Sequence, residues 1–289
     1  MFFNKETPIY LLSQGKEKEA EKSLRHFRGE NYDGIDDEMY KLKIYLEESQ
    51  KNKARITDLK KSYNLKPFSM SMGLFFFQQF VGIGAVLFNM TLIFQSVGFD
   101  LSENMSTIIV GVVQVLALVP SVILMDITGR RSLLTGSAIF MIISEASLGL
   151  YFYFADRNPS VAENVSWLPL ASLIIYILAF NVGFGPIPWL MAGELFSPEI
   201  KDLCISIATM FNWIFCFVVT VTFEPLQSLM YDFGVYWMYG GFCILSLLFS
   251  IFVVFETKGK TLAEINAHFG SPSGAERSED KTVSIFAIT

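Results

Sequence analysis

Six long apolar runs dominate the sequence and limit what the chain can fold into. They cover residues 68–95, 105–125, 133–154, 168–190, 203–223 and 235–255. About 20 apolar residues in a helix cross the hydrocarbon core of a bilayer, and the shortest run has 21. Because backbone polar groups in lipid must be satisfied within the segment, helices are the expected form. The sequence therefore predicts an all-α membrane protein with six transmembrane helices.

Composition agrees with this class and argues against others. The chain is 52% hydrophobic and only 17% charged, and the charges lie almost entirely outside the runs. The two His and three Cys lack metal-ligand spacing, so we expect no metal, no cofactor and no disulfide framework. No ATP-binding loop and no nucleophile constellation is visible. We therefore expect neither an enzyme nor a nucleic-acid-binding protein.

The first 67 residues are charged and only modestly amphipathic. Residues 16–28 and 36–49 predict two helices, and residues 56–63 a third, shorter one. We expect residues 1–67 to form cytosolic helices that pack on the inner face of the membrane domain, 68–255. A solvated linker is the alternative. Residues 256–289 are expected to form a cytosolic tail.

Charges in the connections between runs predict the orientation. The connections after the second and fourth runs carry Arg130, Arg131 and Lys201, whereas the connections on the other side carry only Arg157. The positive-inside rule then places both termini in the cytosol. We expect a multi-pass protein of the plasma membrane.

Two Asn-X-Ser sequences in the outside connections agree with this orientation. They begin at Asn104 and Asn164, which are therefore predicted glycosylation sites. A third match, at Asn89, falls within the first run, where a glycosylating enzyme could not reach it. Chance matches to so short a pattern are frequent, so the pattern alone does not show that a site is used.

The fourth run ends in a segment that interrupts a helix. Gly183, Gly185, Pro186 and Pro188 occur within six positions, and the first charge that follows is Glu194. At membrane depth such a break is tolerated where it lines a cavity or is covered by protein. The segment predicts a discontinuous span beside a polar pathway. A kinked helix without a ligand is the alternative.

Polar residues inside the runs are costly in lipid and are therefore functional candidates. Amides donate and accept hydrogen bonds and suit a neutral hydroxylated ligand, and the aromatic face of Trp189 suits the apolar face of a sugar ring. Hydrogen bonding between helices is the alternative for each amide alone. Glu145 lies deep in the third run with no evident cationic partner, and we assign it no role. The candidate amides are Gln78, Gln79, Gln114 and Asn212.

Five motifs, in this order and spacing, resemble those of the sugar porters of the major facilitator superfamily. They are ETP at 6–8, QQFVG at 78–82, DITGRR at 126–131, GPIPW at 185–189 with ELF at 194–196, and ETKGKTL at 256–262. Within that family the sequence is most similar to facilitated trehalose transporters.

The resemblance implies a fold of twelve spans in two halves, with substrate held between them near the midplane. This chain starts at the family's central loop, so it resembles the C-terminal half of such a transporter, preceded by short cytosolic helices. We expect either a fragment or a half that pairs with another copy or a second chain. Expressed alone, it should show no saturable sugar uptake.

The resemblance also assigns roles to individual residues. It implies sugar contacts at Gln78, Gln79, Gln114, Phe180, Trp189 and Asn212. It implies a cytosolic gate of ion pairs formed by Asp126, Arg130, Arg131, Glu194 and Glu256. Topology alone is the alternative role for the two arginines. The family's first-span Asn is Gly84 here, which removes one hydrogen-bonding group that the nearby Asn89 replaces in part.

These features lead to an expected function. The chain is expected to take part in facilitative transport of a sugar, trehalose or a hexose, by alternating access. A proton-coupled sugar symporter is one alternative, and a non-transporting half-protein or sensor is the other. The expected partners are the sugar, the lipid bilayer and the missing half or second chain.

Overall fold

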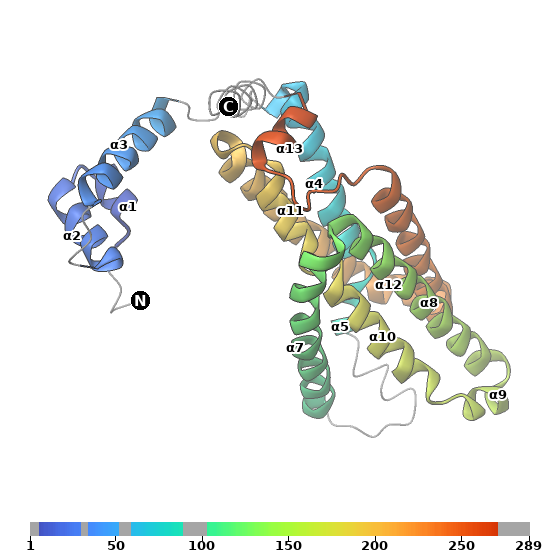
Figure 1. The fold of residues 1–289 in the computed structure, drawn as a ribbon. Helices are drawn as coiled ribbons and strands as arrows, with labels where there is room; N and C mark the ends of the chain where they lie inside the picture. The colour runs from blue at the N-terminus through green and yellow to red at the C-terminus, as the bar shows by residue number, and fades with distance from the viewer. Residues whose placement is uncertain (1–5, 30–33, 52–58, 89–102, 271–289) are drawn as a thin grey trace. The chain divides into compact units, whose positions relative to one another are not determined.

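The computed structural model describes residues 6–29, 34–51, 59–88 and 103–270, and helices dominate all four segments (Figure 1). The chain divides into two compact units, Met1–Arg55 and Ile56–Thr289. The first contains α1 (Pro8–Ser13), α2 (Glu17–Arg28) and α3 (Ile35–Lys51). The second contains α4 (Ser62–Phe80), α5 (Ile83–Phe88), α7 (Glu103–Thr128), α8 (Arg130–Arg157), α9 (Pro159–Asn164), α10 (Leu168–Val182), α11 (Ile187–Leu195), α12 (Pro198–Phe252) and α13 (Leu262–His268).

The first unit is a cluster of three helices around its own apolar core. Two ion pairs join α2 to α3, Arg28 with Glu38 at 2.6 Å and Lys43 with Glu17 at 2.8 Å. The helices α2 and α3 occur where the sequence predicts them. The first residues of the third predicted helix, 56–58, lie outside the described part, and its end, from Ser62, belongs to α4. The buried core residues are Leu11, Ala20, Leu24, Ile35 and Met39.

The second unit contains the apolar helices. Within the described residues, four segments are long and apolar enough to cross a membrane, and Gly111–Met125 is a shorter apolar helix. Figure 1 shows α13 and the start of α4 at one end of this unit and α9 at the other. The helix α8 has 28 residues, which is about 42 Å at 1.5 Å per residue, and it runs between these ends. The four long segments are Ser62–Leu87, Arg130–Arg157, Leu168–Leu195 and Ile200–Phe252.

The longest helix, α12, is not one straight rod. Tyr231 has non-helical backbone angles, φ 59° and ψ 167°, in its interior. The rings of Phe223 and Tyr239 stack at 6.5 Å, although a straight helix would separate these positions by about 24 Å. The chain therefore reverses at Tyr231 into two arms that pack against each other. The first arm contains the predicted apolar run 203–223, and the second contains residues 235–252 of the last run, 235–255.

Two other apolar segments are interrupted. The break expected in the fourth run is present, because α10 ends at Val182 and α11 begins at Ile187. The first run is also broken, between α4 and α5, and the sequence did not predict this. Gly82 adopts φ +97° there, a conformation that favours glycine, and a Cβ on it would lie 2.8 Å from the Tyr239 ring. The α4 helix begins six residues before the predicted start of the run.

Candidate functional site

The break between α10 and α11 is bonded to α4 by one amide. The Gln78 side chain is only 4% exposed. Its Nε2 donates to the carbonyl oxygens of Phe184 at 2.9 Å and Gly185 at 2.7 Å. An interrupted helix leaves carbonyls without intrahelical partners, and in an apolar interior these need another donor. The Gln78 side chain supplies this donor, so its N–H groups hold the backbone of the α10–α11 break in place.

The break between α4 and α5 is in turn hydrogen-bonded by a side chain from α10. The hydroxyl of Tyr176 on α10 donates to the carbonyl oxygen of Val81 at 2.8 Å. The thiol of Cys243 lies 3.9 Å from the same oxygen. Each interrupted segment thus supplies a side chain, placed shortly before its own break, that hydrogen-bonds the broken backbone of the other. The two breaks form one hydrogen-bonded unit.

Two of the other candidate amides, Gln79 and Asn212, contact each other. Nε2 of Gln79 on α4 donates to Oδ1 of Asn212 on α12 at 2.8 Å. The Trp189 ring packs edge-on against Phe75 at 4.8 Å between centroids. Phe75 precedes Gln79 by one helical turn, so the two share a face of α4. Trp189 is 42% exposed, so its ring is only partly covered by this contact.

The two remaining predicted sugar contacts lie on α10 and α7. Phe180 is buried near the end of α10, and its carbonyl oxygen accepts from the backbone N–H of Gly185 at 2.7 Å. Gln114 is partly exposed on α7. Asn89, considered above as a partial replacement for the missing amide at Gly84, lies outside the described residues. No contact between Gln114 and the other candidates is shown, so its role stays a prediction.

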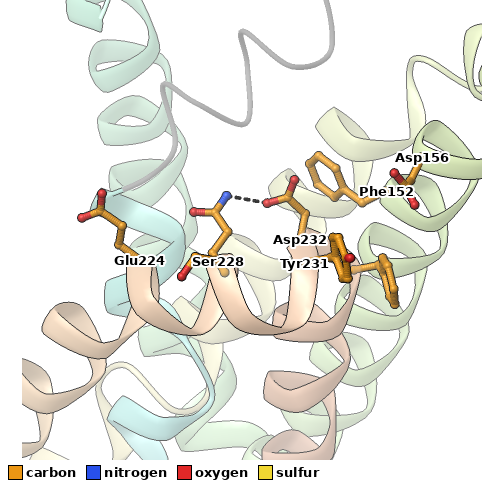
Figure 2. Close-up of a pocket in the computed structure, with 8 residues that line it drawn as sticks. Phe152, Asp156, Glu224, Ser228, Tyr231 and Asp232 are labelled. Carbon is orange, nitrogen blue, oxygen red and sulfur yellow. Dashed lines mark hydrogen bonds between the residues drawn. The ribbon is translucent and has the colours of Figure 1, made fainter.

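A cavity of about 370 Å³ lies at the reversal of α12, next to the end of α8 (Figure 2). It has three carboxylates among its lining residues, and Gln227 donates to one of them, Asp232. None of the predicted sugar contacts lines it, and none lines the apolar cavity of about 400 Å³ between α4 and the arms of α12. The first cavity is lined by Phe152, Asp156, Glu224, Gln227, Ser228, Tyr231, Asp232 and Phe233.

The predicted gate residues gather at the end of the unit where α8 begins. The oxygens of Glu256 accept from the backbone N–H groups of Arg130 and Arg131, both at 3.0 Å. A helix start exposes unpaired N–H groups and partial positive charge, so a carboxylate stabilises it. Gly129 precedes the helix at φ +94°, and a Cβ there would lie 2.7 Å from Glu256 Oε2. The glycine therefore gives this carboxylate access to the helix start.

One ion pair extends this cluster to α11. Nη2 of Arg130 lies 2.9 Å from Oε1 of Glu194, and both side chains are largely shielded from solvent. The hydroxyl of Thr257 donates to the other Glu194 oxygen at 2.6 Å. The Arg131 guanidinium donates to the carbonyl of Ile251. Four of the five predicted gate residues thus lie together, and the side chain of the fifth, Asp126, is outside the described part.

The predicted glycosylation sites lie in or beside helices. Asn104 falls in the first turn of α7, not in a connection as expected. Asn164 is the last residue of α9, where its exposed side chain donates to the carbonyl of Ser160 at 3.0 Å. An exposed asparagine at a helix end is accessible to a glycosylating enzyme, so Asn164 is the stronger candidate for glycosylation.

Comparison with known proteins places this geometry in a family. Residues 1–269 match the family described as sugar (and other) transporter. Trehalose transporter 1 of Drosophila melanogaster is 43% identical over 267 residues, which are 92% of this chain and 31% of that protein. The facilitated trehalose transporter Tret1-2 homolog of Drosophila sechellia is 44% identical over 262 residues, 90% of this chain and 53% of that protein.

Solved structures agree with the sequence comparison. The proton:xylose symporter XylE bound to 6-bromo-6-deoxy-D-glucose superposes with a TM-score of 0.69 at 30% identity, covering 93% of this chain and 55% of that one. The inward-open xylose transporter XylE from E. coli gives 0.69 at 28% identity, covering 91% and 51%. The chain spans about a third to a half of the curated relatives it matches. It belongs to the sugar transporter family of the major facilitator superfamily, and its similarity is to trehalose transporters.

Proposed function

We propose that the chain forms one six-span half of a facilitative sugar carrier, and that the sugar is trehalose or a hexose. The observation that carries this proposal is the amide pair of Gln79 and Asn212, 2.8 Å apart. The partly exposed ring of Trp189 packs on Phe75, one helical turn before Gln79. Amides bond hydroxyl groups in both directions, and an aromatic ring covers the apolar face of a sugar. The relatives named for trehalose and xylose support this substrate class.

The membrane arrangement is part of the same proposal. We place six spans in residues 68–255, with 1–67 and 256–289 in the cytosol of a plasma-membrane protein. The four long apolar segments, the apolar helix in α7 and the reversal of α12 support this division. The cluster of Arg130, Glu194 and Glu256 is then on the cytosolic side. Further spans, in the same polypeptide or in a second chain, complete the sugar pathway.

The cytosolic cluster acts as the gate in this proposal. The pair of Arg130 with Glu194 joins α8 to α11, and Glu256 ties α8 to the segment after α12. Individual ion pairs near a surface are worth about 0–1 kcal/mol, so only the combined network biases the two states of alternating access. Separation of α11 from α8 would break the ion pair and open the pathway to the cytosol.

A chimera tests the sugar site directly. Residues 1–269 replace the matching segment of the Drosophila melanogaster trehalose transporter 1, and labelled trehalose and glucose uptake is measured in reconstituted vesicles. We expect saturable uptake, a large loss of sugar affinity with Trp189→Ala, and little change with Trp213→Ala. Trp213 is the matched control because it is also an exposed tryptophan, at 64%, and follows Asn212 in the sequence, yet it is not among the predicted sugar contacts.

The outcomes separate the proposal from its alternatives. Accumulation of sugar against its gradient when a pH gradient is imposed would favour a proton-coupled symporter. Sugar binding without flux in the chimera would favour a sensor or another non-transporting role. Equal losses with Trp189→Ala and Trp213→Ala would show that the ring of Trp189 has no special contact with sugar.

A further inference from the structure

One buried carboxyl group lies at the centre of the second unit and has no role in the site described above. Glu145 is 15 residues after the start of α8 and 12 before its end, so it lies about 22 Å and 18 Å from the two ends. Its side chain is 1% exposed. Neither carboxyl oxygen has a hydrogen-bond partner within the described part of the chain. A polar group enclosed in this way requires an explanation.

Among the described residues, no positively charged group is shown to compensate Glu145. The titratable groups that interact with it are Tyr176 on α10 and Tyr236, Tyr239 and Cys243 on α12. None of the four is cationic. The Tyr239 hydroxyl is itself buried without a partner in the described residues. An ionised carboxylate is strongly disfavoured in such an enclosure, whereas the neutral acid carries only the smaller cost of a buried polar group.

Three of these neighbours also hold the α4–α5 break. Tyr176 donates to the carbonyl oxygen of Val81, and the Cys243 thiol lies within reach of the same oxygen. The ring of Tyr239 lies against Gly82. A charge on Glu145 would therefore act on the side chains that fix the interrupted first segment, which also carries Gln78 and Gln79.

We propose that Glu145 is a proton-binding site that makes the shape change of the carrier depend on pH. This inference rests on the proposed carrier function. In the enclosed arrangement one Glu145 oxygen holds a proton taken from hydronium, which becomes water. When the shape change of the carrier admits water to Glu145, that O–H bond breaks and the proton returns to a water molecule. Because the proton binds the enclosed arrangement more tightly, low pH favours that arrangement.

Infrared spectroscopy tests proton binding without any need for transport. The full chain in lipid vesicles is titrated with pH, and the C=O stretch of protonated carboxylic acids is followed, with its shift in D₂O as the assignment. We expect a band that Glu145→Gln removes and Glu224→Gln retains. Glu224 is the matched control because it is an exposed carboxyl in the same unit. Glu145→Met, which also lacks a titratable group, replaces Glu145→Gln if the latter fails to fold.

A second measurement tests the pH-dependent shape change. In the chimera with the Drosophila relative, we expect sugar flux to vary with pH and this variation to be lost in Glu145→Gln. A band that is absent, that does not titrate, or that persists in Glu145→Gln would overturn the proton site. A titrating band with an unchanged pH profile of flux in Glu145→Gln would overturn the link to the shape change. A chimera without any flux would refute the proposed function, and the infrared titration would still decide the proton site.

Discussion

The bonds from Gln78 to the α10–α11 break allow a prediction of stability. Replacing Gln78 with Met keeps most of the volume and removes both donated hydrogen bonds. Bonds between membrane helices are worth about 0.6 kcal/mol on average and about 1.7 at most. A buried carbonyl left without a donor costs about 1–3 kcal/mol. Because the bond to Phe184 is buried and the one to Gly185 only partly so, we expect a combined loss of about 1–3 kcal/mol.

The assay is the equilibrium unfolding of the full chain in mixed micelles, titrated with SDS and followed by circular dichroism. A loss of about 1–3 kcal/mol changes the folded-to-unfolded ratio roughly 5- to 150-fold, which shifts the midpoint measurably. Gln79→Met is the matched control, because it removes the single, partly buried bond to Asn212. Its expected loss is about 0.6 kcal/mol. Unfolding of Gln78→Met at the wild-type midpoint, or above that of Gln79→Met, would refute the role of Gln78 in holding the break.

Three further predictions concern other parts of the chain. Asn164→Gln should remove the glycosidase-sensitive mass attached at Asn164 from the protein expressed in insect cells, as seen by a shift in gel mobility. In the chimera, Arg130→Ala and Glu194→Ala should each slow transport yet leave equilibrium sugar binding intact, because these side chains bias conformation and do not touch the ligand; lost binding in a well-folded variant would contradict this. In the first unit, the hydrogen bond and positive charge of Arg28 lower the pKa of Glu38 below 4.5, so its stabilisation is present above that pH and fades as the pH falls through the lowered value; protection of α2 and α3 amides from hydrogen exchange should lose this acid dependence in Arg28→Ala.

Local signals in the sequence were sufficient for the long apolar helices and for one of the two breaks. Long apolar runs identify membrane-type helices because lipid allows little else, and the Gly and Pro cluster after Val182 identifies the interruption before Ile187. The α4–α5 break carries a weaker signal, Gly82 alone. The ring of Tyr239, which leaves no room for a Cβ at Gly82, is more than 150 residues away in the sequence and comes from the arm of α12 that follows the reversal.

The same limit applies to the roles of individual side chains. The sequence identified Gln78 as a polar residue in a costly place, but an amide bonds a backbone carbonyl as readily as a sugar hydroxyl. Only the fold shows that its N–H groups face the carbonyls of the α10–α11 break. Likewise, the motif beginning at Glu256 indicated a charge at a helix end, whereas its contact with the start of α8 requires two segments about 125 residues apart to meet.

The mutual bonds between the two breaks have a consequence for how substrate preference can evolve in this chain. In the proposed carrier, a substitution at Gln78 alters a proposed sugar contact, and a substitution at Gln78 or Tyr176 removes a hydrogen bond to the backbone of another helix. Such positions change only together with a compensating donor elsewhere. The hydrogen bond between Gln79 and Asn212, by contrast, joins two side chains and does not hold a broken backbone segment. New sugar specificities should therefore arise first by paired replacement of Gln79 and Asn212, and directed evolution of this chain is best started there.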